Sequence, residues 1–259
     1  MHNILQMLEL AELAAREAGR AVMQIHRSGR LDIGPKADGS PLTRADRHSN
    51  LIITRHLFNT GLPVLSEEAE GADYSERMKW EYFWMVDPLD GTKEFINGSN
   101  DFTVNIALMK GADPVAGVIY VPASDTTYLG SKAHGAWKRT GAEAVRLPAP
   151  EKRITLENIK DRTSVTAVVS RSHLSPGTME FLDQFRDVRL LNAGSSLKFM
   201  MLIEGEADIY PRMGTTMEWD TAAAHAILHA ADRGIYHTDC LSELRYNKPD
   251  LRNPFFIAF

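Results

Sequence analysis

The sequence of 259 residues predicts a layered α/β fold. Segments with helical spacing of apolar residues open the chain, and a run of strand-like segments separated by glycine and proline follows. In the carboxyl-terminal part, strand-like and helix-like segments alternate, which is typical of sheets covered by helices. With 44% hydrophobic and 24% charged residues, the chain has an ordinary globular composition and the length for one large domain or two closely packed ones.

The amino-terminal part is predicted to contain two helices joined by a loop. Residues 4–27 carry apolar side chains at helical spacing, are rich in Ala, Leu and Glu, and contain no proline. Residues 29–47 are rich in glycine, proline, serine and aspartate, which indicates an exposed, mobile loop. A second helix is expected over 46–58 with its cap near Thr43, and residues 63–65 form a short strand candidate.

The polar side chains of two segments are interpreted as solvated surface residues. Lys36, Asp38, Thr43 and Asp46 lie in or beside the loop, and taken alone they are interpreted as solvated loop residues. Residues 70–79 are acidic and polar, and we interpret them as a solvated excursion without chemistry.

The middle of the chain predicts a sheet. Residues 147–157 change in composition and are the expected boundary between an amino-terminal half, 1–148, and a carboxyl-terminal half, 149–259. The strands expected before this boundary are 103–109, 115–121 and 126–130, with extensions at 135–138 and 144–147.

The carboxyl-terminal half is predicted to alternate strand and helix. Its strands are expected at 165–170, 188–191, 208–210, 234–237 and 255–259, and its helices at 176–185, 196–204 and 219–231.

Charge and cysteine content limit the class of protein. The net charge of −5 argues against binding to a polynucleotide, although bound metals could still attract a small phosphorylated ligand. The single cysteine, Cys240, cannot form an internal disulfide, so a reducing cytoplasm is the expected compartment. No apolar stretch approaches the roughly 18 residues that span a bilayer. Peripheral association with the inner membrane and the oligomeric state stay open.

Two aspartates after an apolar strand are the centre of the predicted site. Residues 83–86 are apolar, Asp87 is expected to end that strand because Pro88 follows, and Asp90 is expected in the turn beyond it. Carboxylates that share a small volume repel unless a cation lies between them, and Mg²⁺ prefers such oxygen ligands. Gly91 allows a close backbone approach and Thr92 adds a hydroxyl. An acidic turn without metal is the alternative interpretation.

A second strand end carries paired acids, Glu67 and Glu68, directly after the strand candidate at 63–65. Ligand sites of open α/β sheets gather at strand ends, so the two acidic ends could meet.

Three further positions in the carboxyl-terminal half could contribute. Ser170 to His173 follow a strand, and Arg171 and His173 could hold an anion or be structurally idle. A glycine-serine turn within 192–198 opens a helix, which suits a phosphate beside Lys198 but equally suits an ordinary serine cap. Asp220 lies at a helix start, where capping is the usual role and metal binding requires that it face Asp87 and Asp90.

These motifs together resemble a known family. The stretch WMVDPLDGTKEF, preceded by LSEE and followed far downstream by WDTAA, is similar to the inositol monophosphatase superfamily of metal-dependent phosphatases. The DGTKEF ending, SRSH and GSSLK most resemble its bacterial CysQ branch, the 3′(2′),5′-bisphosphate nucleotidases. Inositol-specific members usually have Asn and an aromatic residue where this chain has Glu94 and Phe95. Ala224 departs from the glycine of many relatives, which puts no ligand in doubt.

The resemblance implies an α-β-α-β-α sandwich that holds two or three Mg²⁺ around the scissile phosphate. Asp46 would pair with Thr92 to orient and deprotonate the attacking water, with Glu67 as a further catalytic residue. The implied metal ligands are Glu67, Asp87, the Leu89 carbonyl, Asp90 and Asp220. The implied substrate contacts are Lys36, Gly91, Thr92, Ser170, His173, Gly194, Lys198 and Asp220.

The activity implied by the resemblance is Mg²⁺-dependent release of the 3′-phosphate of adenosine 3′,5′-bisphosphate, which yields AMP and phosphate. The sulfated nucleotide 3′-phosphoadenylyl sulfate is a second candidate substrate. The alternatives are an inositol or sugar phosphate phosphatase of the same superfamily, and a non-catalytic module that senses phosphorylated nucleotides through a metal-filled pocket.

Overall fold

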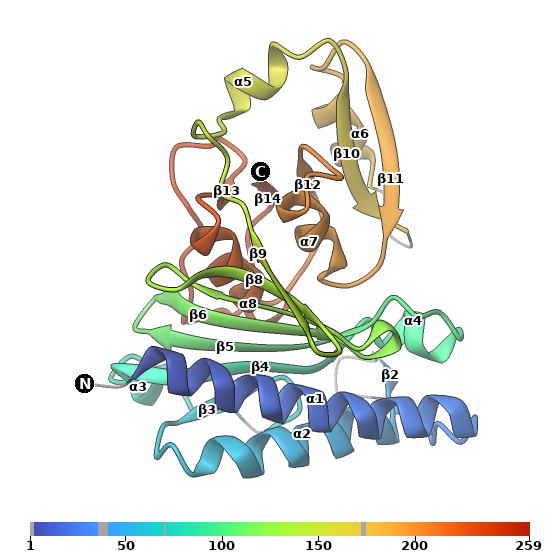
Figure 1. Ribbon diagram of the computed structural model, residues 1–259, viewed down its shortest axis with the longest axis vertical. Coiled ribbons are helices and arrows are strands. Elements are labelled where there is room, and N and C mark those ends of the chain that lie inside the picture. The colour runs from blue at the N-terminus through green and yellow to red at the C-terminus, as the bar shows by residue number, and fades with distance from the viewer. Residues whose placement is uncertain (1–2, 36–40, 70, 172–174) are drawn as a thin grey trace.

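The computed structural model describes residues 3–35, 41–69, 71–171 and 175–259. Its elements form five layers, helix, sheet, helix, sheet and helix; in Figure 1 the first three follow one another upward, and the carboxyl-terminal strands and their covering helices form the upper part. This is the α-β-α-β-α sandwich that the resemblance predicted. Among the described residues, no helix has both the length and the apolar character needed to cross a bilayer.

The first layer consists of α1 (Ile4–Ser28) and α2 (Arg44–Phe58), both close to their predicted bounds. The Asn3 side chain accepts hydrogen bonds from two amides of the first turn of α1, and the helix ends at Gly29 in the left-handed conformation, with φ of 66°. Thr43 caps α2 as the sequence predicted. Local signals therefore define both helices.

The second layer is a seven-stranded sheet, antiparallel except for the parallel β3–β4 pair. Every strand predicted between residues 63 and 147 is present. Along β4, Trp84 and Val86 pack toward α1 and α2, and Phe83 and Met85 pack toward the middle of the molecule. In spatial order the strands are β3 (Val64–Ser66), β4 (Tyr82–Asp90), β5 (Thr103–Lys110), β6 (Asp113–Val121), β7 (Thr126–Ser131), β8 (Gly135–Thr140) and β9 (Glu143–Leu147).

Strand β4 continues past the point where the sequence predicted its end. Asp87 pairs with Asn105 and Asp90 pairs with Thr103, so β4 carries one extra residue between these positions. Pro88 lies in this irregular stretch because it has no N–H to donate to the ladder. The prediction that Asp90 lies in a turn beyond the strand was wrong, because a bulge absorbs the proline without ending the strand.

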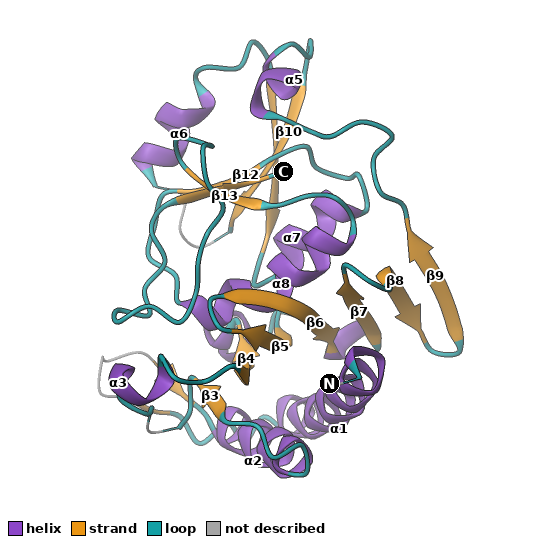
Figure 2. Cartoon of the chain, turned by 90° about the vertical axis from the view of Figure 1, so that its left-hand side faces the viewer, coloured by secondary structure: helices purple, strands orange, loops and turns teal. Residues whose placement is uncertain are grey.

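The third layer contains α7 (Leu197–Ile203) and α8 (Glu218–Ala230), which lie between the seven-stranded sheet and the carboxyl-terminal strands in Figures 1 and 2. Helix α8 packs so closely on β6 that a Cβ at Gly117 would collide with the carbonyl group of Ala223, 2.9 Å from its carbon atom. The small residues on both sides of this contact explain the close approach.

The fourth layer consists of two small sheets, the parallel pair β10–β11 and the three strands β12, β14 and β13, and α5 (Leu156–Lys160) and α6 (Pro176–Leu182) cover its far side as the fifth layer. Val168 packs against the α8 cluster, whereas Val165, Ala167 and Val169 pack toward α5 and α6. The strands are β10 (Val165–Ser170), β11 (Val188–Ala193), β12 (Tyr210–Arg212), β13 (Ile235–His237) and β14 (Phe256–Ala258).

Several bounds in this half differ from the prediction, and β11 continues to Ala193 instead of ending at residue 191. The strand expected at 208–210 lies at 210–212. Residues 208 and 209 are used otherwise: the Asp208 side chain accepts a hydrogen bond from the Thr166 backbone N–H at 2.7 Å, and Ile209 forms a single bridge to β10. Helix α6 ends at Leu182 instead of continuing to residue 185.

The segment predicted as a solvated excursion contains a buried charge, so that prediction was wrong for the described residues 71–79. Arg77 is 3% exposed and donates hydrogen bonds to the Asn247 side chain at 2.7 Å and to the Lys248 carbonyl at 3.1 Å. Sequence alone could not show these partners because they lie about 170 residues away.

The remaining short elements are α3 (Tyr74–Arg77), α4 (Thr92–Ile96), β1 (Gly34–Pro35), β2 (Pro41–Leu42) and a 3₁₀ turn (Pro122–Ser124).

The predicted boundary between halves falls in the connection from β9 to α5. One hydrophobic cluster nevertheless contains side chains of both halves, including Phe83 and Met85 of β4 and Phe199 of α7. The division into 1–148 and 149–259 stays a prediction.

The Gly117 contact leads to a stability prediction. Replacement of Gly117 by Ala should lower the free energy of unfolding by about 3 kcal/mol, because the clash is with backbone that cannot rotate away. Urea unfolding measures the change. Gly34→Ala is the matched control, since a Cβ there meets no atom within 4 Å, and an equal loss in both variants would contradict the packing account.

Candidate active site

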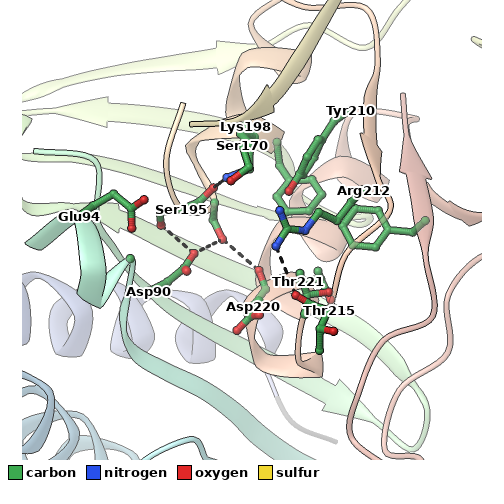
Figure 3. Close-up of a pocket in the computed structure, with 15 residues that line it drawn as sticks. Asp90, Glu94, Ser170, Ser195, Lys198, Tyr210, Arg212, Thr215, Asp220 and Thr221 are labelled. Carbon is green, nitrogen blue, oxygen red and sulfur yellow. Dashed lines mark hydrogen bonds between the residues drawn. The ribbon is translucent and has the colours of Figure 1, made fainter. Parts of the chain in front are cut away.

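Four carboxylates from three separate segments influence one another at the end of β4. Glu67 follows β3, Asp87 and Asp90 belong to β4, and Asp220 lies in the first turn of α8. Asp90 and Asp220 line the same pocket, which Figure 3 shows. The sequence allowed Asp220 to bind metal only if it faces the aspartates of β4. The fold meets this requirement.

The two acidic strand ends meet because β3 and β4 pair in parallel. Ser66 is opposite Val86, and the Glu67 N–H donates to the Val86 carbonyl at 3.1 Å. This register brings Glu67 beside Asp87, and the two side chains form a hydrogen-bonding contact.

Burial makes the negative charges costly. Asp87 is 2% exposed, and burial followed by the neighbouring Glu67, Asp90 and Asp220 raises its pKa well above the usual range. The Asp220 pKa is raised in the same way, by burial and then by Asp90 and Glu67. The Met217 N–H, which donates to the Asp220 carboxylate at 2.8 Å, acts in the opposite direction.

A pair of serines holds Asp90 in position. Its Oδ2 atom accepts hydrogen bonds from Ser195 at 2.7 Å, from Ser196 at 2.9 Å and from Asn105 at 3.3 Å. The Ser196 hydroxyl also lies 3.0 Å from the Asp220 backbone carbonyl, so it bridges the end of β4 and the start of α8. Ser196 stands at the N-cap position of α7, but its hydroxyl makes no capping hydrogen bond.

The donor set fits a hard divalent cation. The side chains of Glu67, Asp87, Asp90 and Asp220 offer only oxygen atoms, and a carbonyl is available at Leu89 between the β4 aspartates. Oxygen ligands of this kind suit Mg²⁺, whose charge would offset the repulsion that raises the two pKa values.

Thr92 and Asp46 are in contact. The Thr92 hydroxyl lies 3.1 Å from Asp46 Oδ1 and 3.1 Å from the Leu89 carbonyl. Asp46 Oδ2 accepts the N–H and hydroxyl of Thr43, and both side chains are buried. The interpretation of Thr43 and Asp46 as solvated loop residues was therefore wrong, because they form the capping box of α2 against the end of β4.

Gly91 adopts a conformation that other residues avoid. Its φ is 92°, and a Cβ would lie 2.8 Å from the Asp101 carbonyl and 3.3 Å from the Ser195 side chain. It lines the pocket, and glycine there lets the chain turn from β4 into α4.

Lys198 places a cation in the same pocket as Ser170. Its Nζ atom donates to the Ser195 carbonyl at 2.6 Å, and burial lowers the pKa of the amine to about 8. Asp90, Glu94 and Asp220 oppose this shift and Arg212 adds to it.

The other residues that the sequence predicted to bind an anion do not line this pocket or lie outside the described residues. The Gly194 N–H donates to Asp101 at 3.2 Å, and Gly194 does not line the pocket. Arg171 forms an ion pair with Asp101 at 3.0 Å. Lys36 and His173 lie outside the described residues.

Sequence reasoning missed several residues of the site. Arg212, Tyr210 and Glu94 line the pocket, and the Arg212 Nε atom is buried without a partner among the described residues. The Ser49 hydroxyl donates to the Pro88 carbonyl at 2.6 Å and so fixes the bulge. The sequence signal that could have indicated Arg212 was a cationic residue just after the strand predicted at 208–210. No local sequence feature distinguished Ser49 from other helical serines.

Comparison with known proteins identifies the family. The model of the "Inositol monophosphatase family" matches residues 3–251. The chain belongs to the inositol monophosphatase family.

Two relatives of this protein have the same name, CysQ. The 3′(2′),5′-bisphosphate nucleotidase CysQ of Escherichia coli K12 is 39% identical over 234 residues, which cover 89% of this chain and 90% of that protein. The CysQ of Haemophilus influenzae is 32% identical over 249 residues, which cover 95% of this chain and 89% of that protein. These similarities agree with the branch that the sequence motifs indicated.

Solved structures agree on the fold. The crystal structure of CysQ from Bacteroides thetaiotaomicron has a TM-score of 0.83 at 41% identity and covers 98% of this chain and 96% of that chain. An IMPase from Thermotoga maritima has a TM-score of 0.75 at 20% identity and covers 98% of this chain and 91% of that chain, which concerns the fold alone.

The role of Ser196 can be tested through metal affinity. Ser196→Ala should weaken Mg²⁺ binding by about 10- to 100-fold, because groups that orient ligands contribute on that scale. Isothermal titration calorimetry with Mg²⁺ measures the change. Ser28→Ala, which removes a serine hydroxyl bonded within α1, is the control, and equal affinities of the two variants would contradict the role of the serine.

Proposed function

We propose that this protein is a Mg²⁺-dependent phosphomonoesterase that removes the 3′-phosphate of adenosine 3′,5′-bisphosphate to give AMP and phosphate. The observation that carries the proposal is the convergence of Asp87, Asp90 and Asp220 beside the hydrogen-bonded pair of Thr92 and Asp46. The bisphosphate substrate is taken from the name of the Escherichia coli relative, which is 39% identical, and the solved structure that is 41% identical is also called CysQ. The sulfated nucleotide 3′-phosphoadenylyl sulfate is a second candidate substrate.

The proposed ligands for two or three Mg²⁺ are Glu67, Asp87, Asp90 and Asp220 with the Leu89 carbonyl. When bound, Mg²⁺ supplies charge neutralisation at the phosphoester and lowers the pKa of a water molecule. The chain contributes the fixed positions of these oxygens, because β4, its bulge and the first turn of α8 hold them before substrate arrives.

Thr92 and Asp46 are proposed to orient the attacking water. The Thr92 hydroxyl donates toward Asp46, which leaves lone pairs of the hydroxyl oxygen to accept a hydrogen bond from water. Asp46 stays anchored by the Thr43 amide at 2.7 Å, so it can take up the proton that the water loses without moving. Direct attack by water requires no covalent intermediate with the protein.

Cations in the pocket are proposed to bind the phosphate groups of the substrate. Lys198 and Arg212 lie with Asp90 and Asp220 around one cavity, which places positive charge beside the carboxylates. Ser170, Gly91 and Gly194 are further proposed contacts, together with Lys36 and His173 from the resemblance. Glu94, which also lines the pocket, occupies the position at which the resemblance separates nucleotidases from inositol phosphatases.

An inositol or sugar phosphatase is the alternative enzyme, and a non-catalytic nucleotide sensor is the alternative of another class. The contact between Thr92 and Asp46 favours an enzyme, since a pure binding module has no use for a group that activates water.

The cytoplasmic location stays a prediction from the sequence, and the comparisons give no support to the peripheral association with the inner membrane that the sequence left open.

Substrate competition tests the assignment. We expect turnover of adenosine 3′,5′-bisphosphate to exceed that of inositol 1-phosphate when phosphate release is measured with Mg²⁺. Faster release from the inositol ester would overturn the nucleotidase proposal and leave the phosphatase class intact.

Replacement of one carboxylate tests the metal-dependent mechanism. Asp90→Asn should lower kcat/KM by more than about 100-fold, because even residues that only orient metal ligands contribute 10- to 100-fold. Asp125→Asn, which alters a surface aspartate paired with Arg16, should leave turnover unchanged. Near-normal turnover of Asp90→Asn would remove this residue from the proposed ligands.

Lys198 should give the reaction a characteristic pH dependence. With a pKa of about 8, the amine loses its charge at higher pH, so kcat/KM for the bisphosphate should fall as the pH rises through about 8. Lys198→Met should lower kcat/KM at pH 7 by about 10- to 100-fold, as expected for a lost charged hydrogen bond, and should remove this fall. An identical fall in the variant would show that another group is responsible.

A further inference from the structure

The far part of helix α8 carries a second group of metal-ligating side chains. His225 and His229 are four residues apart on the helix, so their rings lie on the same face, with centroids 4.2 Å apart. Glu243 comes from the segment after β13. A backbone bridge between Tyr236 and Glu243 holds that segment in place, as does the Leu244 N–H, which donates to the Ile235 carbonyl at 2.9 Å.

The three side chains meet at one point. The His229 Nε2 atom lies 2.5 Å from Glu243 Oε2, and the His225 Nε2 atom lies 3.5 Å from the same oxygen. One ligand atom from each residue can be chosen so that all lie within 4.8 Å of one another. This group is separate from the carboxylates at the end of β4.

Metal binding uses the tautomer of His225 that has its proton on Nδ1. The Tyr246 hydroxyl lies 3.0 Å from Nδ1 and can accept a hydrogen bond from that N–H. The Nε2 atom, 3.4 Å from the Ile235 backbone nitrogen and 3.5 Å from Glu243 Oε2, then offers a lone pair. The ring is fully buried, and burial lowers its pKa to about 4, which keeps it neutral at pH 7.

Without a metal, both imidazoles can hydrogen-bond to the Glu243 carboxylate. A divalent cation would replace the proton between each ring nitrogen and the carboxylate, because the three ligand atoms lie within 4.8 Å of one another. The Tyr246 hydroxyl then acts as the outer partner that fixes the orientation of a metal-bound imidazole.

We propose that His225, His229 and Glu243 form a second metal site, which binds Zn²⁺. Two imidazole nitrogens and one carboxylate are a ligand set that suits Zn²⁺, whereas Mg²⁺ prefers ligands that are all oxygen. His229 and Glu243 also line a surface pocket, which gives the ion a path from solvent and leaves room for water as a fourth ligand. The site joins α8 to the segment after β13 and stabilises that connection when filled.

Metal titration tests the proposal. Tag-free protein is stripped of metal, supplied with excess Mg²⁺ to occupy the carboxylates, and titrated with Zn²⁺ by calorimetry and with Co²⁺ by visible absorption. Wild type should bind one Zn²⁺ and give the intense visible bands of tetrahedral Co²⁺, which an octahedral all-oxygen site does not produce.

Ligand variants and a matched control make the test specific. His229→Gln and Glu243→Gln should each weaken Zn²⁺ binding by at least about 100-fold and remove the Co²⁺ bands. His56→Gln is the control, because it removes another histidine–glutamate pair, with Glu17, that forms no cluster with a second histidine among the described residues. Wild-type affinity for Zn²⁺ in either ligand variant would overturn the proposal.

A measurement on the wild-type protein keeps the test independent of variant folding. The Nε2 resonances of His225 and His229 in ¹⁵N NMR spectra should shift when one equivalent of Zn²⁺ is added. If both resonances stay unchanged up to several equivalents of Zn²⁺, the proposal is wrong, whatever the variants do.

Discussion

Mutual repulsion of buried carboxylates is the constraint on which the arrangement of the site depends. Burial and neighbouring charges raise the pKa of Asp87 and of Asp220, and folding has to hold these groups together despite that cost. The structure does so with rigid parts. The bulge of β4 is held by the Ser49 hydroxyl, and Ser196 connects Asp90 to the start of α8. Such a site is prepared for a cation before the cation arrives.

Helix α8 connects the main features of the molecule. It begins with a carboxylate of the candidate active site, packs through Ala223 on Gly117 in the middle of the large sheet, and ends at the His225 and His229 pair. Its two ends offer different ligands, all oxygen at one and mainly nitrogen at the other, so the two proposed sites would favour different metals. Because one helix carries both, loss of its packing on the sheet would affect both sites at once.

The sequence predicted features that depend on local signals. The 3.6-residue periodicity of α1, the Thr43 cap of α2 and the strand run from β5 to β9 were all recognisable without tertiary information. The aspartates of β4 stood out because both follow an apolar strand. What stayed hidden depends on distant partners. Continuation of β4 past Pro88 requires pairing with β5, and Ser196 gains its role only when β4 and α8 meet.

Crystals soaked with Mn²⁺, a divalent substitute for Mg²⁺ with a strong anomalous signal, test the central claim most directly. The account predicts anomalous peaks among the carboxylates of Glu67, Asp87, Asp90 and Asp220, with the Asp220 carboxylate coordinated to an ion that Asp90 also binds. A map in which ions bind at the β4 aspartates while Asp220 coordinates none of them would contradict the convergence of distant carboxylates into one metal site.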